Sequence, residues 1–105
     1  MKERPKTEAE LVSRLRLPNK KEGELFGLAI QLHGSDQIRV ACDDGVERMC
    51  RIPGKLRKRV WVRVGDVVII KKWDIQPIKA DIKWLYYGTQ VERLKREGHL
   101  KGLPL

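Results

Sequence analysis

The sequence predicts an all-β protein, a small barrel of five strands followed by a short helix. Five short segments within about 65 residues alternate apolar and polar side chains, as half-buried strands do. Glycine, proline and aspartate gather between these segments, where they indicate turns. The longest connection falls between the third and fourth segments, and the length of 105 residues suits a single domain.

The first two strands are expected at residues 23–32 and 37–42, separated by a turn at 33–36. The side chains of the first strand alternate between two faces. We therefore predict a half-buried strand, with one of these faces toward the core. In the second strand, the predicted inward positions are Ile38, Val40 and Cys42.

The third strand is expected at residues 46–52, after a hairpin turn at Asp43-Asp44-Gly45. Cys50 and Ile52 are predicted to face inward. Arg48 interrupts the alternation, and the pattern does not assign it to a face.

The fourth and fifth strands are expected at residues 67–73 and 79–86. One face of the fifth strand is predicted to carry Ala80, Ile82, Trp84 and Tyr86. Gly88 ends this strand, and a short helix is predicted to follow, with Thr89 as its N-cap and Gly98 just after its end.

This arrangement predicts an OB-fold, a five-stranded barrel whose strands two and three commonly bind oligonucleotides. An SH3-like barrel is the main structural alternative. The expected organisation is a flexible basic tail at 1–22, an OB-fold barrel at 23–87, and a short helix with a C-terminal tail at 88–105.

Positive charge is concentrated in one part of the chain. The net charge is +9, and residues 48–72 alone carry nine basic residues against one acidic residue, a net +8. Residues 23–47 instead carry a net −4, from one basic and five acidic residues. A concentrated basic surface is typical of a polyanion site, and a solvated face without a partner is the alternative.

Nothing in the sequence predicts a membrane segment or a secretory signal. The longest aliphatic run is residues 67–70, far short of the ~18 apolar residues that a membrane helix needs. The N-terminal residues lack the apolar core and cleavage site of a signal peptide. We therefore expect a cytoplasmic protein.

Catalytic, metal and cofactor functions find no support in the sequence. The two cysteines, Cys42 and Cys50, are predicted to be small buried residues in a reducing compartment. His33 and His99 are distant from each other and would need an unusual fold to join these cysteines around a metal. No nucleophile motif or phosphate-binding glycine pattern is present, so we expect neither an enzyme nor a cofactor.

A basic segment with an aromatic end is the main candidate for nucleic-acid binding. Lysine and arginine suit the gripping of a phosphate backbone, and Gly54 would allow the main chain to come close. The predicted contacts in and beside this segment are Arg51, Lys55, Arg57, Lys58, Arg59 and Trp61. Arg39, on the outward face of the second strand, belongs to the same candidate set.

The tryptophans differ in what their positions predict. Lys71, Lys72 and Trp73, at the end of the fourth strand, also belong to the candidate RNA contacts, and Trp73 is the best candidate for stacking on an unpaired base. Trp84 alternates with Ile82 and is predicted to lie in the core. For Trp61 the sequence allows two roles, packing in the barrel and contact with RNA.

Three motifs resemble translation initiation factor 1A, in its archaeal form. They are Asp44-Gly45, the run from Ile52 to Trp61, and Gly65-Asp66-Val67-Val68 followed by Trp73-Asp74. The likeness runs from about Leu17 to Leu100 and includes the helix after the barrel.

The resemblance implies an S1-like OB barrel that acts as a monomer. It implies binding to small-subunit ribosomal RNA in the decoding region, at the aminoacyl-tRNA site. It also implies help in assembling initiator methionyl-tRNA and mRNA for start-codon selection, while contacts with other initiation factors stay open. On the matching positions, the RNA-contacting loop would be Lys55 and Arg57 to Arg59, and the basic tail would add Arg14, Arg16, Lys20 and Lys21.

Two other classes of protein remain as alternatives. A general single-strand binder of the cold-shock type usually presents aromatic side chains on strands two and three. Here the predicted outward positions offer none, which counts against this class. A protein-interaction barrel, with a basic surface that serves only solubility, is the second alternative.

Overall fold

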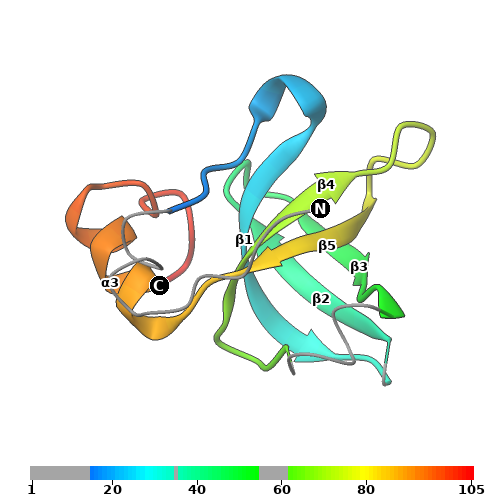
Figure 1. The fold of residues 1–105 in the computed structure, drawn as a ribbon. Helices are drawn as coiled ribbons and strands as arrows, with labels where there is room; N and C mark the ends of the chain where they lie inside the picture. The colour runs from blue at the N-terminus through cyan, green and yellow to red at the C-terminus, as the bar shows by residue number, and fades with distance from the viewer. Residues whose placement is uncertain (1–14, 35, 55–61) are drawn as a thin grey trace.

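The chain forms a closed five-stranded barrel with a helix packed beside it (Figure 1). The computed structural model describes residues 15–34, 36–54 and 62–105. The strands are β1 (Glu24–Leu32), β2 (Gln37–Cys42), β3 (Glu47–Arg51), β4 (Val67–Lys72) and β5 (Lys79–Leu85). A 3-10 turn, η1 (Lys20–Glu22), precedes them, and the helix α3 (Gly88–Arg96) follows.

The strand order around the barrel is β1-β2-β3-β5-β4, and β4 pairs with β1 to close it. The β3–β5 pair is parallel, and the other four pairs are antiparallel. This arrangement confirms the predicted OB-fold with its short C-terminal helix. The observed strand bounds lie within two residues of the predicted ones.

The barrel core, as we call the cluster inside the barrel, forms from the inward side chains of all five strands. Ile38, Val40 and Cys42 on β2 alternate with exposed or half-buried neighbours, as predicted. Cys50 and Ile52 are also inside, and both cysteines are buried free thiols. The core is therefore made of small and branched side chains that fill a narrow barrel.

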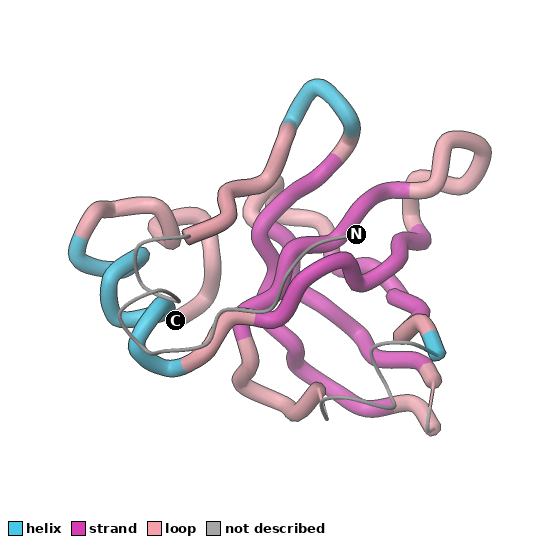
Figure 2. The backbone as a smooth tube through the Cα atoms, viewed as in Figure 1, coloured by secondary structure: helices cyan, strands magenta, loops and turns pink. Residues whose placement is uncertain are grey.

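A second apolar cluster, the outer cluster, lies on the outside of β1 and β4, between these strands and the C-terminal segment. Its buried members are Phe26, Leu28, Val67, Ile69, Tyr86, Leu94, Leu100 and Leu103. Figure 2 shows the C-terminal helix and loops gathered against one side of the strands. The prediction of a half-buried first strand is thus wrong for its first six residues, which are buried on both faces.

Two register shifts change which side chains face inward. In β5, Ile70 pairs with Ile82 while Ile69 pairs with Trp84, so Lys83 is an extra residue. Such a bulge moves the following side chains to the opposite face. Trp84 therefore packs against the outer cluster and Leu85 against the barrel core. The prediction that Trp84 and Tyr86 share the face of Ile82 is wrong for this reason. A similar shift occurs in β1 at Ile30.

The helix begins earlier than its sequence predicts. Its N-cap is Tyr87, whose backbone N–H donates to the Gln90 side-chain oxygen at 2.9 Å, so the prediction of Thr89 as the cap is wrong. Gly98 has a φ of 78° just beyond the helix, which confirms its predicted place after the helix end. No helix in the described part of the chain is long and apolar enough to cross a membrane.

Residues 15–22, the described part of the predicted tail, contact the barrel. The Arg16 guanidinium donates to Glu24 at 3.0 Å, and the Tyr86 hydroxyl donates to the Arg16 carbonyl oxygen. The Asn19 backbone N–H donates to the other Glu24 oxygen at 3.0 Å. One buried carboxylate thus holds two points of this segment next to the start of β1.

Candidate nucleic-acid interface

Outward side chains from four strands form rows across the end of the barrel where β4 finishes. The register places Lys71 opposite Asp81, Asp81 beside Arg51, and Arg51 opposite Gln37. The neighbouring row contains Lys79, Met49 and Arg39. Basic side chains predicted from separate parts of the sequence therefore share one face.

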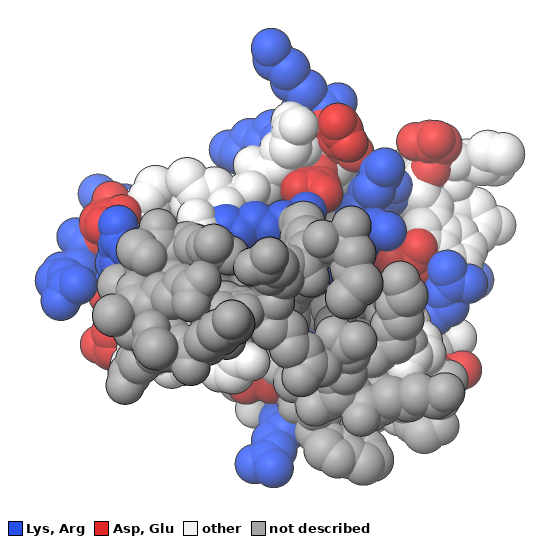
Figure 3. Space-filling view, in the orientation of Figure 1, with Lys and Arg blue, Asp and Glu red and all other residues white. Residues whose placement is uncertain are grey.

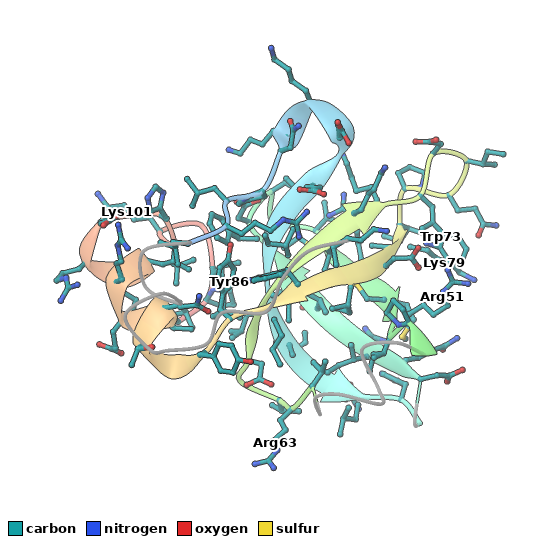
Figure 4. The ribbon with its side chains drawn as sticks, in the orientation of Figure 1. Arg51, Arg63, Trp73, Lys79, Tyr86 and Lys101 are labelled. Carbon is teal, nitrogen blue, oxygen red and sulfur yellow. The ribbon has the colours of Figure 1, made fainter. Side chains whose placement is uncertain are left out.

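Trp73 is the centre of a cluster on this face. Its indole N–H donates to Asp81 Oδ1 at 3.1 Å, which fixes the orientation of the ring. The Arg51 guanidinium carbon and the Lys79 ammonium nitrogen lie 5.8 Å and 5.7 Å from the ring centroid, within the range of cation–π attraction. Figure 4 shows the three labelled side chains together at one edge of the barrel.

Asp81 organises this cluster as an acceptor. Arg51 donates to both of its carboxylate oxygens, from Nε at 3.1 Å and from Nη2 at 3.3 Å. Both oxygens are therefore occupied by the guanidinium, and one also by the indole. The arrangement holds a planar ring and a planar cation in fixed positions, which suits the recognition of a nucleotide.

The four lysines predicted at Lys20, Lys21, Lys71 and Lys72 come together. They line an open concavity of about 520 Å³ between the η1 turn and the end of β4, with Gly23, Trp73 and Pro77. Glu22 and Asp74 lie at the same concavity. In Figure 3, basic side chains project beyond the top of the molecule, where η1 lies, and acidic side chains lie beside them.

A second concavity, of about 470 Å³, lies on the β5 side of the same strand end. Lys71, Lys72 and Trp73 line it together with Ile75, Gln76, Asp81 and Lys83. Lys79, Asp81 and Lys83 are not among the functional residues predicted from the sequence. Their signal was nonetheless present, since Asp81 and Lys83 alternate with the apolar face of the fifth strand.

Arg39 and Arg16 are each paired with a carboxylate, and the remaining predicted residues lie outside the described part. Arg39, in the row with Met49 and Lys79, forms a loose ion pair with Glu47 at 3.6 Å. Arg16 is engaged with Glu24, and its guanidinium lies 5.7 Å from the Trp84 ring. The residues outside the described ranges are Arg14, Lys55, Arg57, Lys58, Arg59 and Trp61.

Arg48 has a structural position that the sequence left open. It faces the same side as Cys50 and is 5% exposed. Its guanidinium donates to both Asp44 oxygens at 3.0 Å and 2.9 Å, and to the Pro77 carbonyl oxygen at 2.6 Å. The hydrogen bonds from Arg48 lower the pKa of the Asp44 carboxyl.

Within the described ranges, no group of three or more histidine, cysteine or acidic residues could hold a metal ion.

The fold and this surface define a small OB-barrel protein that presents lysine, arginine and tryptophan at one end of the barrel. The chain belongs to the family Translation initiation factor 1A / IF-1, whose model matches residues 12–103. Initiation factors of this family are not enzymes, and the expectation of a non-enzymatic protein is confirmed on that ground.

The chain is similar to archaeal proteins named Translation initiation factor 1A. It is 54% identical to the protein from Archaeoglobus fulgidus over 90 residues, which cover 86% of this chain and 93% of that relative. It is 52% identical to the protein from Methanopyrus kandleri over 91 residues, or 87% and 80% of the two chains. These relatives confirm the resemblance identified from the three sequence motifs.

Solved structures support the fold. The crystal structure of YjeQ from Thermotoga maritima matches with a TM-score of 0.52 at 20% identity, over 61% of this chain and 23% of that chain. At this identity the match bears on the barrel alone.

Proposed function

We propose that this chain binds the small ribosomal subunit through ribosomal RNA, in the decoding region at the aminoacyl-tRNA site. Bound there, it promotes the assembly of initiator methionyl-tRNA and mRNA for start-codon selection. It acts in the cytoplasm as a monomer, without a cofactor. Membership of the initiation factor family supports this role, and the charge distribution supports RNA as the contact.

The observation that carries the proposal is the placement of the basic residues. Ile52 lies shortly before residues 55–61 in the sequence, and Val62 comes directly after them. The side chains of Ile52 and Val62 are buried in the barrel core. Arg51, just before this segment, lies on the face that also carries Lys71 and Trp73. The described residues on both sides of the basic segment therefore belong to the barrel, and Arg51 belongs to a face that is itself basic and aromatic, which supports RNA contact in this region.

Co-sedimentation with archaeal ribosomal subunits tests the proposal. The purified chain is sedimented with small and with large subunits at several salt concentrations, beside a variant with Arg57, Lys58 and Arg59 replaced by alanine. We expect stoichiometric binding to small subunits that salt weakens. In the variant, the slope of log affinity against log salt should fall by about 2, because fewer counterions are released from phosphates.

A matched control replaces Lys95, Arg96 and Lys101 by alanine, which removes the same charge from the C-terminal part. This control should bind nearly as the unaltered chain does. If both triple variants lose the same affinity, only overall charge matters and the proposed position of the contact is wrong.

A general single-strand binder is the alternative with the clearest structural test. The outward positions of β2 and β3 are Gln37, Arg39, Ala41, Glu47, Met49 and Arg51, none of them aromatic. Equal affinity for both subunits and for unstructured RNA would favour that alternative. Unchanged small-subunit affinity after charge reversal at Arg57, Lys58 and Arg59 would favour a protein-interaction barrel.

A further inference from the structure

The end of β4 forms a ridge between the two concavities described above. Lys71, Lys72 and Trp73 line both of them. The η1 turn borders one concavity, and the β4–β5 loop borders the other. Figure 1 shows this turn and this loop at the same end of the barrel. A ligand that crosses the ridge would contact both concavities at once.

One side of the ridge suits the base of a nucleotide. The Trp73 ring is held by Asp81 and lines the second concavity. Ile75, in the loop beside it, is 94% exposed, more than any other large apolar side chain in the described part of the chain. An aromatic ring of fixed orientation beside a fully exposed aliphatic side chain offers two apolar surfaces to a flat ligand.

The other side of the ridge suits phosphates. Lys20, Lys21 and Lys72 line the first concavity, and none of them forms an ion pair with a carboxylate in the described ranges. Glu22 and Asp74 reduce the net charge of this concavity but do not cancel it. Three ammonium groups on two segments of chain, without an ion pair in the described ranges, favour a ligand with more than one negative charge.

We propose that this ridge seats one unpaired nucleotide of the bound RNA. Its base packs between Trp73 and Ile75, and the phosphates on either side of it contact Lys20, Lys21 and Lys72. The concavity volumes of about 520 and 470 Å³ fall in the range of sites for single small ligands. The proposal rests on the proposed function, and it adds a contact separate from the 55–61 segment.

The occupant is RNA and not a protein segment because the charges around the ridge are already arranged for phosphate. Two acidic side chains, Asp74 and Asp81, line the second concavity, and the Asp81 carboxylate is occupied by Arg51 and by the indole of Trp73. A peptide docking on Ile75 would leave the surrounding lysines without partners. A nucleotide satisfies both the apolar surfaces and the ammonium groups.

Fluorescence anisotropy with labelled uridine and adenosine hexamers tests the proposal. Ile75→Asp is the first variant, because a residue exposed at this level can be replaced without a change in folding. We expect about a tenfold loss of affinity, equivalent to ~1.4 kcal/mol. Leu105→Asp is the matched control, since it introduces the same charge at another exposed apolar residue, and it should change the affinity less than twofold.

Two further variants separate the base contact from the phosphate contact. Trp73→Phe keeps an aromatic surface and should retain most of the affinity, whereas Trp73→Ala should lose about tenfold. Lys72→Ala should weaken binding to both hexamers equally, and its control, Lys101→Ala, should not. Urea unfolding of each variant shows whether the barrel is intact.

The outcomes distinguish this proposal from the proposed function. Unchanged hexamer affinity in Ile75→Asp, Trp73→Ala and Lys72→Ala would overturn the nucleotide site and leave Ile75 for a protein partner. If small-subunit binding stays intact in that case, the proposed function stands. Loss of hexamer binding in these variants, in a chain that shows no preference for small subunits, would support the site and contradict the proposed ribosomal position.

Discussion

Arg48 shows how one buried side chain links two connecting segments of a barrel. Arg48 lies on β3 just after the β2–β3 hairpin, and its side chain is buried. It joins the hairpin, through Asp44, to the β4–β5 loop, through the Pro77 carbonyl. Alternation could not assign its face, because an inward arginine is stable only when its guanidinium has hydrogen-bond partners. Its partners lie on two other segments, and a local sequence pattern does not show them.

Replacement of Arg48 by alanine should lower the free energy of unfolding by about 2 kcal/mol. The change removes three hydrogen bonds and leaves the Pro77 carbonyl without its donor. Urea unfolding followed by tryptophan fluorescence measures the effect. Arg39→Ala is the control, because the Arg39 ion pair is exposed, and it should change stability by less than about 0.5 kcal/mol. Equal effects would contradict the structural role of Arg48.

The Asp44 carboxyl should make stability depend on acidic pH. Arg48 lowers its pKa from the ordinary value of 3.8, so the folded state favours the ionised form. This stabilisation is present above about pH 4 and is lost as the pH falls through the lowered pKa. The midpoint of urea unfolding should therefore be higher for the unaltered chain than for Asp44→Asn at pH 6, and this difference should shrink as the pH falls below the ordinary pKa of an aspartate. Neighbouring Asp43, whose pKa burial raises, is present in both chains.

Strands that are regular were predictable, and strands with bulges were not. The inward side chains of β2 were predicted correctly because no residue is inserted in its pairing with β3. The predicted face of Trp84 was wrong because Lys83 adds one residue to β5, and sequence alternation carries no sign of this insertion. The covering of β1 on its outer face was missed as well, since it depends on Leu100 and Leu103, about 70 residues later.

The candidate site was predictable only where its residues are neighbours in the sequence. Lysines at the end of β4 were predicted because they adjoin a tryptophan in the sequence. Their meeting with Lys20 and Lys21 requires the pairing of β1 with β4, which no local pattern shows. Asp81 was not selected, because a single carboxylate on a strand gives no sign that it holds an arginine and an indole.

Deletion of Lys83 should be far less damaging than deletion of its neighbour Ile82. Without Lys83, Ile82 and Trp84 are consecutive and keep their pairing with Ile70 and Ile69, so Trp84 stays on the outer side and Leu85 in the barrel core. Deletion of Ile82 would instead place Lys83 opposite Ile70, facing the barrel core, and should cost more than about 3 kcal/mol. Urea unfolding compares the two deletion variants. Equal losses of stability would contradict the assignment of Lys83 as the extra residue of the bulge.

At the scale of the whole molecule, closure of the barrel hides both thiols. Cys42 is 2% and Cys50 is 0% exposed. Burial raises the pKa of the Cys50 thiol to about 12, so the reactive thiolate is scarce at neutral pH. Both thiols belong to the barrel core, so we expect them to become accessible when the barrel opens.

Thiol labelling should therefore report opening of the barrel. With Ellman's reagent at pH 8, both cysteines should react at once in strong urea and far more slowly in native buffer. A destabilised variant such as Arg48→Ala should react faster than the unaltered chain under native conditions. Rapid labelling of the unaltered chain would contradict a closed barrel.

The double burial of β1 has a consequence for how the molecule opens. This strand gives Leu25 and Ala29 to the barrel core and Phe26 and Leu28 to the outer cluster. Because β1 contributes side chains to both clusters, the loss of either cluster would expose one face of this strand. Amide hydrogens of β1 should then exchange with deuterium only through global unfolding, and α3 should not melt as a separate unit. The barrel and its C-terminal cover would form one cooperative unit.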